Sequence, residues 1–378
     1  MSIDHIPAEM LLFLVFYGVT GVVPLMAALY LLLRRSNAIA PGVTPPVLLR
    51  RWTAAFFAVT TLAHIWWLLF YIFSWDLQSV GYMVLAMADI VLLFATFAGM
   101  LLAMLQDRSR PIWPALVSVI PFVVLEVVYM VVPSSLLEQI AAGYLVLLGL
   151  LFTGYMVFAI RQYGRWLNDN YADLENKKVW LSQAVSLVCM LMFVLYVLAT
   201  DMVLIWFIHI IELVLVGLLL WRVETLPLLD SISTEEACDE SDPETAAQDN
   251  LTQLRQASAN LTNIDLSQIE RLLVEHCVDT QLYLQHDLSL QQLARTIGTN
   301  RSYLSQYFSR QGITYNTYIN NLRINHFISR YQEVNGTQQP FTVQQLASES
   351  GYHSYSTFSL AFKQRTGQSV TAWMHDAV

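Results

Sequence analysis

The chain has 378 residues, of which 56% are hydrophobic and only 13% are charged. Soluble globular proteins carry about 25% charged residues, so the composition excludes an ordinary soluble protein and favours a membrane protein. The net charge of −9 is uneven: residues 223–266 hold ten acidic residues and one basic residue, whereas the regions on either side are close to neutral. The three cysteines show no spacing typical of a disulfide framework or a metal site.

The first 222 residues contain seven apolar segments, each long enough to cross a bilayer with about 20 residues. The first segment has no positively charged residue before it and is longer than the core of a signal peptide. Prolines inside the segments are compatible with a bundle of membrane helices. The predicted spans are 11–33, 53–73, 80–105, 112–132, 140–160, 179–199 and 202–221.

The positions of Lys and Arg between these spans predict the orientation. All of them follow spans one, three, five or seven, and the alternate connections and the N-terminus contain none. Cytoplasmic loops are the ones enriched in Lys and Arg. We therefore expect a multi-pass protein of the cell (inner) membrane, with its N-terminus outside and its C-terminal region in the cytoplasm.

Five ionisable residues lie inside the predicted spans. Such residues are costly in a bilayer and often functional, and the outer connections are too short to form a sensor domain. They are therefore candidate sensor residues, forming a polar ligand cavity or a proton-sensitive network: His64, Asp89, Glu126, His209 and Glu212. The alternative, favoured for any single residue, is that each pairs across helices and only holds the bundle together.

A metal site built from His64, Glu126, His209 and Glu212 is chemically conceivable. Their spacings match no known motif, however, and an intramembrane hydrolase is disfavoured. The sequence therefore predicts no metal, no cofactor and no enzyme activity.

Residues 223–266 are acidic and polar with few aromatic residues, which is typical of a flexible linker. Leu251, Leu254 and Leu261 form a short helical stripe that is a candidate homodimer contact. The stripe is too short to predict a coiled coil.

Residues 267–378 contain two similar patterns of two short helices joined at a glycine. Ser289 with Gln292, and Thr342 with Gln345, have capping-box spacing, which predicts a helix start. Ser267 with Glu270 predicts a third. Each of the first two helices is followed by a glycine, Gly298 or Gly351, suited to a left-handed C-cap.

The second helix of each pattern is expected to begin near Asn300 or Ser354. Pairs four residues apart form its buried face: Leu304 with Phe308, and Phe358 with Phe362. Residues 315–331 predict one long helix between the two patterns. The arrangement is that of two helix-turn-helix motifs on a common spacer.

The second pattern carries a family resemblance through Leu346-Ala347, Gly351-Tyr352, Phe358, Phe362-Lys363 and Gly367. Residues 268–375 resemble the DNA-binding domain of the AraC/XylS family of bacterial transcription regulators. Val370 stands where that family usually has proline, and Trp373-Met374 where it usually has Tyr or Phe and then Arg. The resemblance implies binding to double-stranded promoter DNA and RNA polymerase as a partner.

Helical geometry predicts which side chains of the second helices face DNA, because they lie opposite the buried pairs. The base-facing candidates are Ser302, Ser305, Gln306, Ser309, Ser356, Ser359 and Leu360. Basic side chains are better suited to phosphates, which set position rather than sequence. These candidates are Arg301, Arg310, Arg323, Lys363 and Arg365.

The sequence thus predicts an all-α protein with a seven-helix transmembrane bundle (1–222), an acidic linker (223–266) and a tandem helix-turn-helix domain (267–378). The expected function is a membrane-bound one-component transcription regulator, with the bundle as sensor or anchor. The expected partners are DNA, the lipid bilayer, a second copy of the chain, RNA polymerase, and an unidentified small-molecule or membrane signal. The alternative is a membrane transporter or enzyme with a regulatory DNA-binding appendage.

Overall fold

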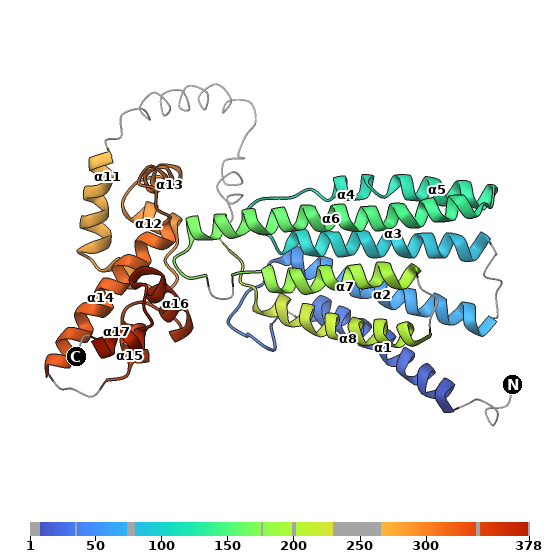
Figure 1. Ribbon diagram of the computed structural model, residues 1–378, viewed down its shortest axis with the longest axis horizontal. Coiled ribbons are helices and arrows are strands. Elements are labelled where there is room, and N and C mark those ends of the chain that lie inside the picture. Colours follow the sequence, from blue (N-terminus) through green and yellow to red (C-terminus); the bar gives the residue numbers. More distant parts are fainter. Residues whose placement is uncertain are drawn as a thin grey trace, which may run out of the picture. The chain divides into compact units, whose positions relative to one another are not determined.

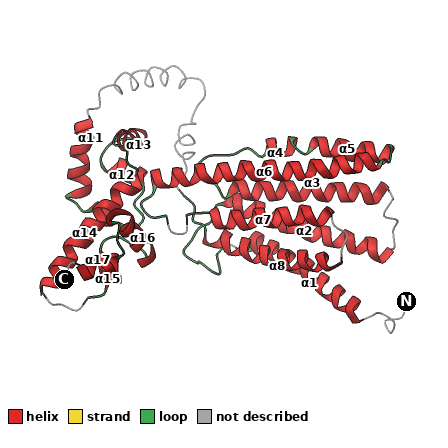
Figure 2. Ribbon diagram, viewed as in Figure 1, coloured by secondary structure: helices red, strands yellow, loops and turns green. Residues whose placement is uncertain are grey.

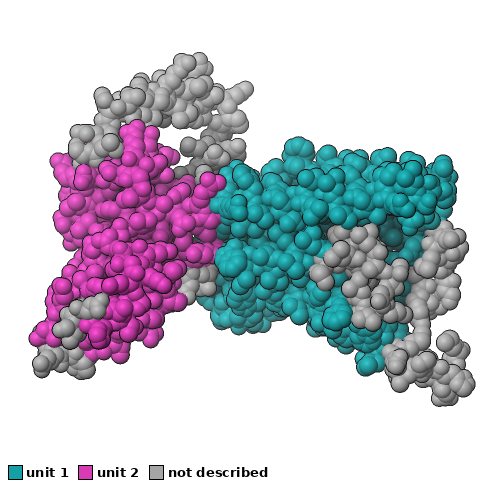
Figure 3. Space-filling view, viewed as in Figure 1, with its two compact units in different colours: residues 1–163, 179–232 teal, residues 164–178, 233–378 magenta. Residues whose placement is uncertain are grey.

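The computed structural model describes residues 8–34, 36–73, 80–174, 177–198, 202–229, 266–337 and 341–376. All the named elements in these ranges are helical, which confirms the predicted fold class (Figure 2). Most of the predicted linker, including the leucine stripe at 251–261, lies outside the described residues. The chain forms two compact units, one of residues 1–163 and 179–232 and the other of residues 164–178 and 233–378 (Figure 3).

The first unit is a bundle of long apolar helices (Figure 1). In the described residues, six segments are long and apolar enough to cross a membrane, and a seventh is a shorter apolar stretch, Trp180–Leu191. The helices are α1 (Ala8–Leu33), α2 (Val47–Phe73), α3 (Val80–Ala103), α4 (Trp113–Val117), α5 (Ile120–Val131), α6 (Ser135–Asn170), α7 (Trp180–Leu198) and α8 (Met202–Thr225).

Several helices extend beyond the predicted spans, α2 for example beginning at Val47, and two segments show the largest differences. The fourth is split into α4 and α5, with Pro121 in the first turn of α5. Proline lacks an N–H and clashes with the carbonyl four residues earlier, so it interrupts the helix. The fifth segment lies in α6, which has 36 residues and continues beyond the predicted span to include Arg161 and Arg165. Its length of about 54 Å exceeds the bilayer core of about 30 Å.

The bundle core lies mainly between α1, α2, α3 and α8. Near the start of α2 and the end of α3, Gly99 lies directly against the indole of Trp52. Many large apolar side chains point outward, among them Leu147, Leu151 and Phe158 of α6. An apolar exterior of this kind is suited to lipid rather than water.

The second unit contains shorter helices. They are α11 (Leu266–Leu273), the π-helical turn η3 (Val274–Val278), the 3₁₀ turn η4 (Leu282–Leu284), α12 (Leu290–Thr296), α13 (Arg301–Arg310), α14 (Tyr315–Thr337), α15 (Val343–Glu349), α16 (Tyr355–Thr366) and α17 (Val370–Asp376). The predicted long helix is therefore present and extends six residues further. Ser267 lies inside α11 and does not start it, so the third predicted capping box is wrong.

The other predicted helix ends are confirmed. Ser289 and the side chain of Gln292 form both bonds of a capping box at the start of α12. The side chain of Thr342 accepts from the Gln345 N–H and caps α15, and Gln345 Nε2 donates to Glu349 Oε1 on the same helix. Gly298 and Gly351 have φ of +71° and +88°, the left-handed conformation that lets the chain turn into the second helix.

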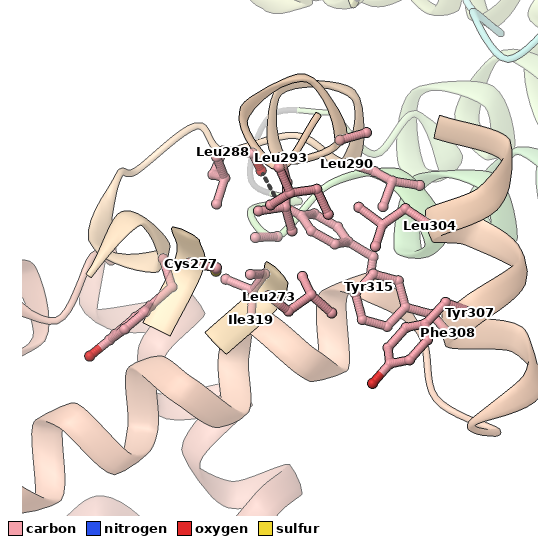
Figure 4. Packing of buried hydrophobic residues seen from close by; sticks show 14 of the residues in the cluster. Leu273, Cys277, Leu288, Leu290, Leu293, Leu304, Tyr307, Phe308, Tyr315 and Ile319 are labelled. Atoms are coloured by element: carbon pink, nitrogen blue, oxygen red, sulfur yellow. Dashed lines mark hydrogen bonds between the residues drawn. The ribbon is translucent and has the colours of Figure 1, made fainter. Parts of the chain in front are cut away.

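Two apolar cores lie along α14. The first packs α11, α12 and α13 around Tyr315 and Ile319, at the start of α14 (Figure 4). The second packs α15, α16 and α17 around Phe327 and Tyr331, further along the same helix. Each helix-turn-helix therefore has its own core, and α14 belongs to both.

Candidate nucleic-acid interface

The first helix-turn-helix consists of α12 and α13 and exposes one polar face. Leu304 and Phe308 are buried, as predicted. The four side chains predicted to face bases are all exposed on α13: Ser302, Ser305, Gln306 and Ser309. Arg310 is also exposed, in the last turn of the helix. This face can donate and accept hydrogen bonds at base edges, with a positive charge beside it.

The second helix-turn-helix consists of α15 and α16. Phe358 and Phe362 are fully buried, and the opposite face carries Ser356 and Leu360, the latter 55% exposed, with Ser359 half-buried. Lys363 and Arg365 are exposed in the last turn, and Arg365 Nη2 donates to Asn325 Oδ1 of α14 at 2.9 Å. The face is therefore more apolar at its centre than that of α13.

The helix α14 connects the two motifs without a break. Its 23 residues correspond to about 34 Å, close to one turn of B-DNA. The first half of α14 packs on one motif and the second half on the other. The connection is therefore a rigid spacer and not a flexible loop.

Comparison with known families matches residues 293–376 to the model of a helix-turn-helix domain. This part of the chain is an AraC-type helix-turn-helix domain. No curated protein and no solved structure was found to match the chain. The matched residues begin within α12 and end with α17, so they include α13, α14, α15, α16 and α17 in full.

Within the AraC-type domain, Arg323 has a structural position. It is only 1% exposed. Its Nε donates to the Tyr283 carbonyl at 2.7 Å, and its Nη2 donates to the carbonyls of Gln285 and His286 at 2.7 and 3.2 Å. Burial lowers the pKa of its guanidinium. A buried cation engaged by three carbonyls is not placed to meet a phosphate, so we leave Arg323 out of the proposed DNA contacts.

The sequence contains a signal that the side chain of Arg323 is buried. Arg323 is four residues after Ile319 and four before Phe327, on the apolar stripe of α14. Its contacts also connect η4 to the second motif, because its guanidinium lies over the Tyr352 ring. Gly351, in the turn of the second motif, has room for no side chain because an added Cβ would lie 2.8 Å from the Leu284 carbonyl oxygen and 3.0 Å from Arg323 Nε.

A polar cluster lies beside this junction. His353 Nε2 is 3.1 Å from Asp287 Oδ2, and Lys177 Nζ is 3.4 Å from Asp287 Oδ1. Burial raises the pKa of Asp287, but the bond to His353 and the charge of Lys177 outweigh it and hold that pKa below its usual value. A lowered carboxyl pKa stabilises the fold above the unfolded pKa, and this contribution is lost as the pH falls through the folded pKa.

The AraC-type domain also binds a segment from the membrane half of the sequence, which the sequence did not predict. Asn316 Nδ2 donates to the carbonyls of Tyr171 and Ala172 at 3.0 and 2.7 Å. Ala172 is buried in the first apolar core. Tyr171 forms a β-bridge with Ser289, the N-cap of α12. Residues 171–172 are therefore part of the second unit.

One residue that was predicted to contact phosphate is hydrogen-bonded to the end of α6, directly before this segment. Arg301, at the start of α13, donates from Nε to Asn170 Oδ1 at 2.8 Å. Asn170 is the last residue of α6. Arg301 is half-buried here, in contrast to the exposed Arg310, Lys363 and Arg365.

The structure gathers three of the five candidate sensor residues and separates the other two. His64 of α2 lies beside His209 and Glu212 of α8, with their ligand-type atoms within 4.8 Å of one another. Asp89 of α3 instead accepts from the indoles of Trp66 and Trp67 at 3.0 and 3.1 Å. Glu126 lies on α5, which packs against α3.

Proposed function

We propose that the chain is a membrane-bound one-component transcription regulator. The AraC-type domain assigns it to DNA-binding transcription regulation. Sequence-specific binding to promoter DNA, and a bundle that senses as well as anchors, are the finer parts of the proposal. The bundle would hold the regulator in the bilayer, and the signal would act on the domain through the chain itself.

The observation that carries the DNA-binding part is the pair of exposed helix faces held by α14. Gln306 and the serines of α13 offer hydrogen bonds, and Ser356 and Leu360 of α16 offer a smaller, more apolar surface. Arg310, Lys363 and Arg365 add positive charge at the ends of these faces. A spacer of about one DNA turn supports contacts in successive major grooves.

The distribution of basic residues supports a cytoplasmic domain. Eleven Lys and Arg residues lie on one side of the predicted topology and none on the other. With an odd number of spans, the N-terminus is outside and the C-terminus inside, where DNA is present. The partners we propose are promoter DNA, lipid and RNA polymerase, with a second copy of the chain as a dimer partner.

The segment at the end of α6 supports a route from signal to DNA. Since α6 continues as one helix to Asn170, a shift of α6 would move the groups that bond to Arg301 and Asn316. Both belong to the first helix-turn-helix or the spacer directly after it. A signal in the bundle would thus change how the first motif is presented to DNA.

The decisive experiment maps chromosomal sites bound by the intact chain in cells. We expect discrete promoter sites that share one sequence. A variant with Gln306→Ala, Arg310→Ala and Lys363→Ala should lose them while remaining in the membrane at normal abundance. Binding without a shared sequence, or sites unchanged in the triple variant, would contradict the proposal.

A further inference from the structure

Two histidines and a carboxylate meet inside the bundle, where α1, α2 and α8 pack together. Nε2 of His64 lies 3.5 Å from Oε2 of Glu212. The rings of His64 and His209 are 5.4 Å apart at 84°. The side chains of His64 and Glu212 are only 10% and 18% exposed.

The hydrogen bond at Nδ1 of His64 determines which of its two ring nitrogens can act as an acceptor, and it is the one that faces the Glu212 carboxylate. Its Nδ1 lies 2.8 Å from the carbonyl oxygen of Thr60. A carbonyl can only accept, so in the neutral ring Nδ1 carries the proton and Nε2 presents a lone pair. Nε2 of His64 and Oε1 of Glu212 are both buried, and neither has a hydrogen-bond partner among the described residues. Two lone-pair groups that face each other in an apolar bundle need either a shared proton or a metal cation between them.

The spacing of His64 and Glu212 fits a metal ion, and His209 offers a third ligand atom within 4.8 Å of both. Bonds of about 2.1 Å in a tetrahedral site place neighbouring ligand atoms about 3.4 Å apart, close to the 3.5 Å between His64 and Glu212. Metal-binding histidines usually donate their other N–H to a carbonyl or carboxylate, which orients the ring. Thr60 provides such a carbonyl for His64.

The surroundings hold the three side chains in place. The Tyr17 ring packs on both imidazoles, with centroids 4.9 Å from His64 and 5.3 Å from His209. At Gly21 an added Cβ would lie 3.2 Å from His64 Cβ, so the glycine allows α1 to approach α2 at this point. Ligands that are oriented by their neighbours lose little freedom when they bind an ion.

We propose that His64, His209 and Glu212 bind one divalent transition-metal ion of the Zn²⁺ class. Imidazole nitrogen favours such ions over Mg²⁺ and Ca²⁺, which prefer oxygen ligands. Three protein ligands leave a fourth position for water or a small molecule. Glu126, which the sequence placed in the same group, is not part of it. A bound ion would define the class of ligand that the bundle takes, which deepens the proposed sensing function. Any effect of the ion on transcription rests on that proposed function.

The position within the helices suggests which side the ion comes from. His64 lies about 14 Å from the Phe73 end of α2, and His209 about 10 Å from the Met202 end of α8, at 1.5 Å per residue. Both ends face outward in the proposed topology. The site would therefore bind ions from outside the cytoplasm.

Zn²⁺ binding is tested on the full chain, purified in detergent through a tag without histidines and stripped with a chelator. Equilibrium dialysis against ZnCl₂ with elemental analysis should show one tightly bound Zn²⁺ per chain. Glu212→Gln and His209→Gln should each weaken this binding at least tenfold. The matched control is His353→Gln, because Asp173, Asp287 and His353 form the other possible metal group in the described residues, where Lys177 already neutralises Asp287. The control should bind Zn²⁺ like the unaltered chain.

A rescue variant separates lost ligation from lost folding. Glu212→His keeps three ligand atoms and should retain Zn²⁺, whereas Glu212→Gln, of similar size to the native residue, should not. Absence of tight Zn²⁺ binding in the unaltered chain would overturn the proposal, and would indicate a proton shared between His64 and Glu212. Equal binding by the unaltered chain and both Gln variants would overturn it too. Failure of the chain to bind promoters would contradict the proposed function without changing the dialysis result.

Discussion

Gln306 and Leu360 occupy the same position on the two recognition helices, each two residues after a buried core residue, Leu304 or Phe358. One is a bidentate hydrogen-bonding amide, and the other is an apolar side chain that is 55% exposed. An amide can select adenine, whereas leucine can contact only a thymine methyl group or a sugar. The two motifs are therefore expected to contribute unequally to specificity.

Gln306→Ala should cost about 1–3 kcal/mol at one base position of a cognate site and relax the preference there. The measurement is binding of the full chain to a cognate duplex and to single-base variants of it. Arg310→Ala is the comparison: it should weaken binding to all sequences and reduce the dependence of affinity on salt. Uniform weakening by Gln306→Ala would show that this face does not contact bases.

Arg323 shows that a basic residue in a DNA-binding domain can serve the fold. Arg323→Gln should destabilise the AraC-type domain by about 3 kcal/mol, because buried carbonyls lose a charged donor. Hydrogen exchange of the full chain should then be faster in η4 and α14. The matched control is Arg330→Gln on the same helix, where the side chain forms surface ion pairs with Glu333 and Glu349, and exchange should not change. Equal exchange in both variants would contradict the structural role.

At the scale of elements, local signals and packing act together. Side-chain caps start α12, α13, α15 and α16, and left-handed glycines end the first helix of each motif. The length of α14 then places the motifs along one rigid axis. In the bundle, close approach of helices depends on small residues, since lipid offers no hydrophobic driving force between helices.

Gly99 tests this dependence between α2 and α3. An alanine Cβ would lie 2.5 Å from Cδ2 of Trp52, and overpacking of this kind costs about 1–3 kcal/mol. Gly99→Ala should lower the thermal unfolding temperature of the full chain in detergent. Gly154→Ala on α6 is the control, because nothing lies within 4 Å of its added Cβ. If the two variants unfold at the same temperature, the α2–α3 contact is not close.

At the scale of the whole molecule, the proposed regulator requires its DNA-binding domain on the cytoplasmic side. A reporter that is active only in the cytoplasm should be active when fused after Trp221 and inactive when fused after Trp75. The reason is the concentration of Lys and Arg in alternate loops. The opposite pattern of activity would invert the topology and exclude contact with chromosomal DNA.

The membrane segments and the helix-turn-helix motifs could be derived from the sequence because their causes are local. A bilayer requires about 20 apolar residues, and a cap or a glycine acts on its own helix end. Partner choice between distant segments is not local. It depends on how each helix is rotated about its axis and on which helices surround it, and hydropathy specifies neither. Only the tertiary structure separated Glu126 from His64, His209 and Glu212, paired Asp89 with two indoles, buried Arg323 against η4, and placed Tyr171 and Ala172 in the DNA-binding unit. Each of these outcomes depends on which segments, distant in the sequence, lie next to one another.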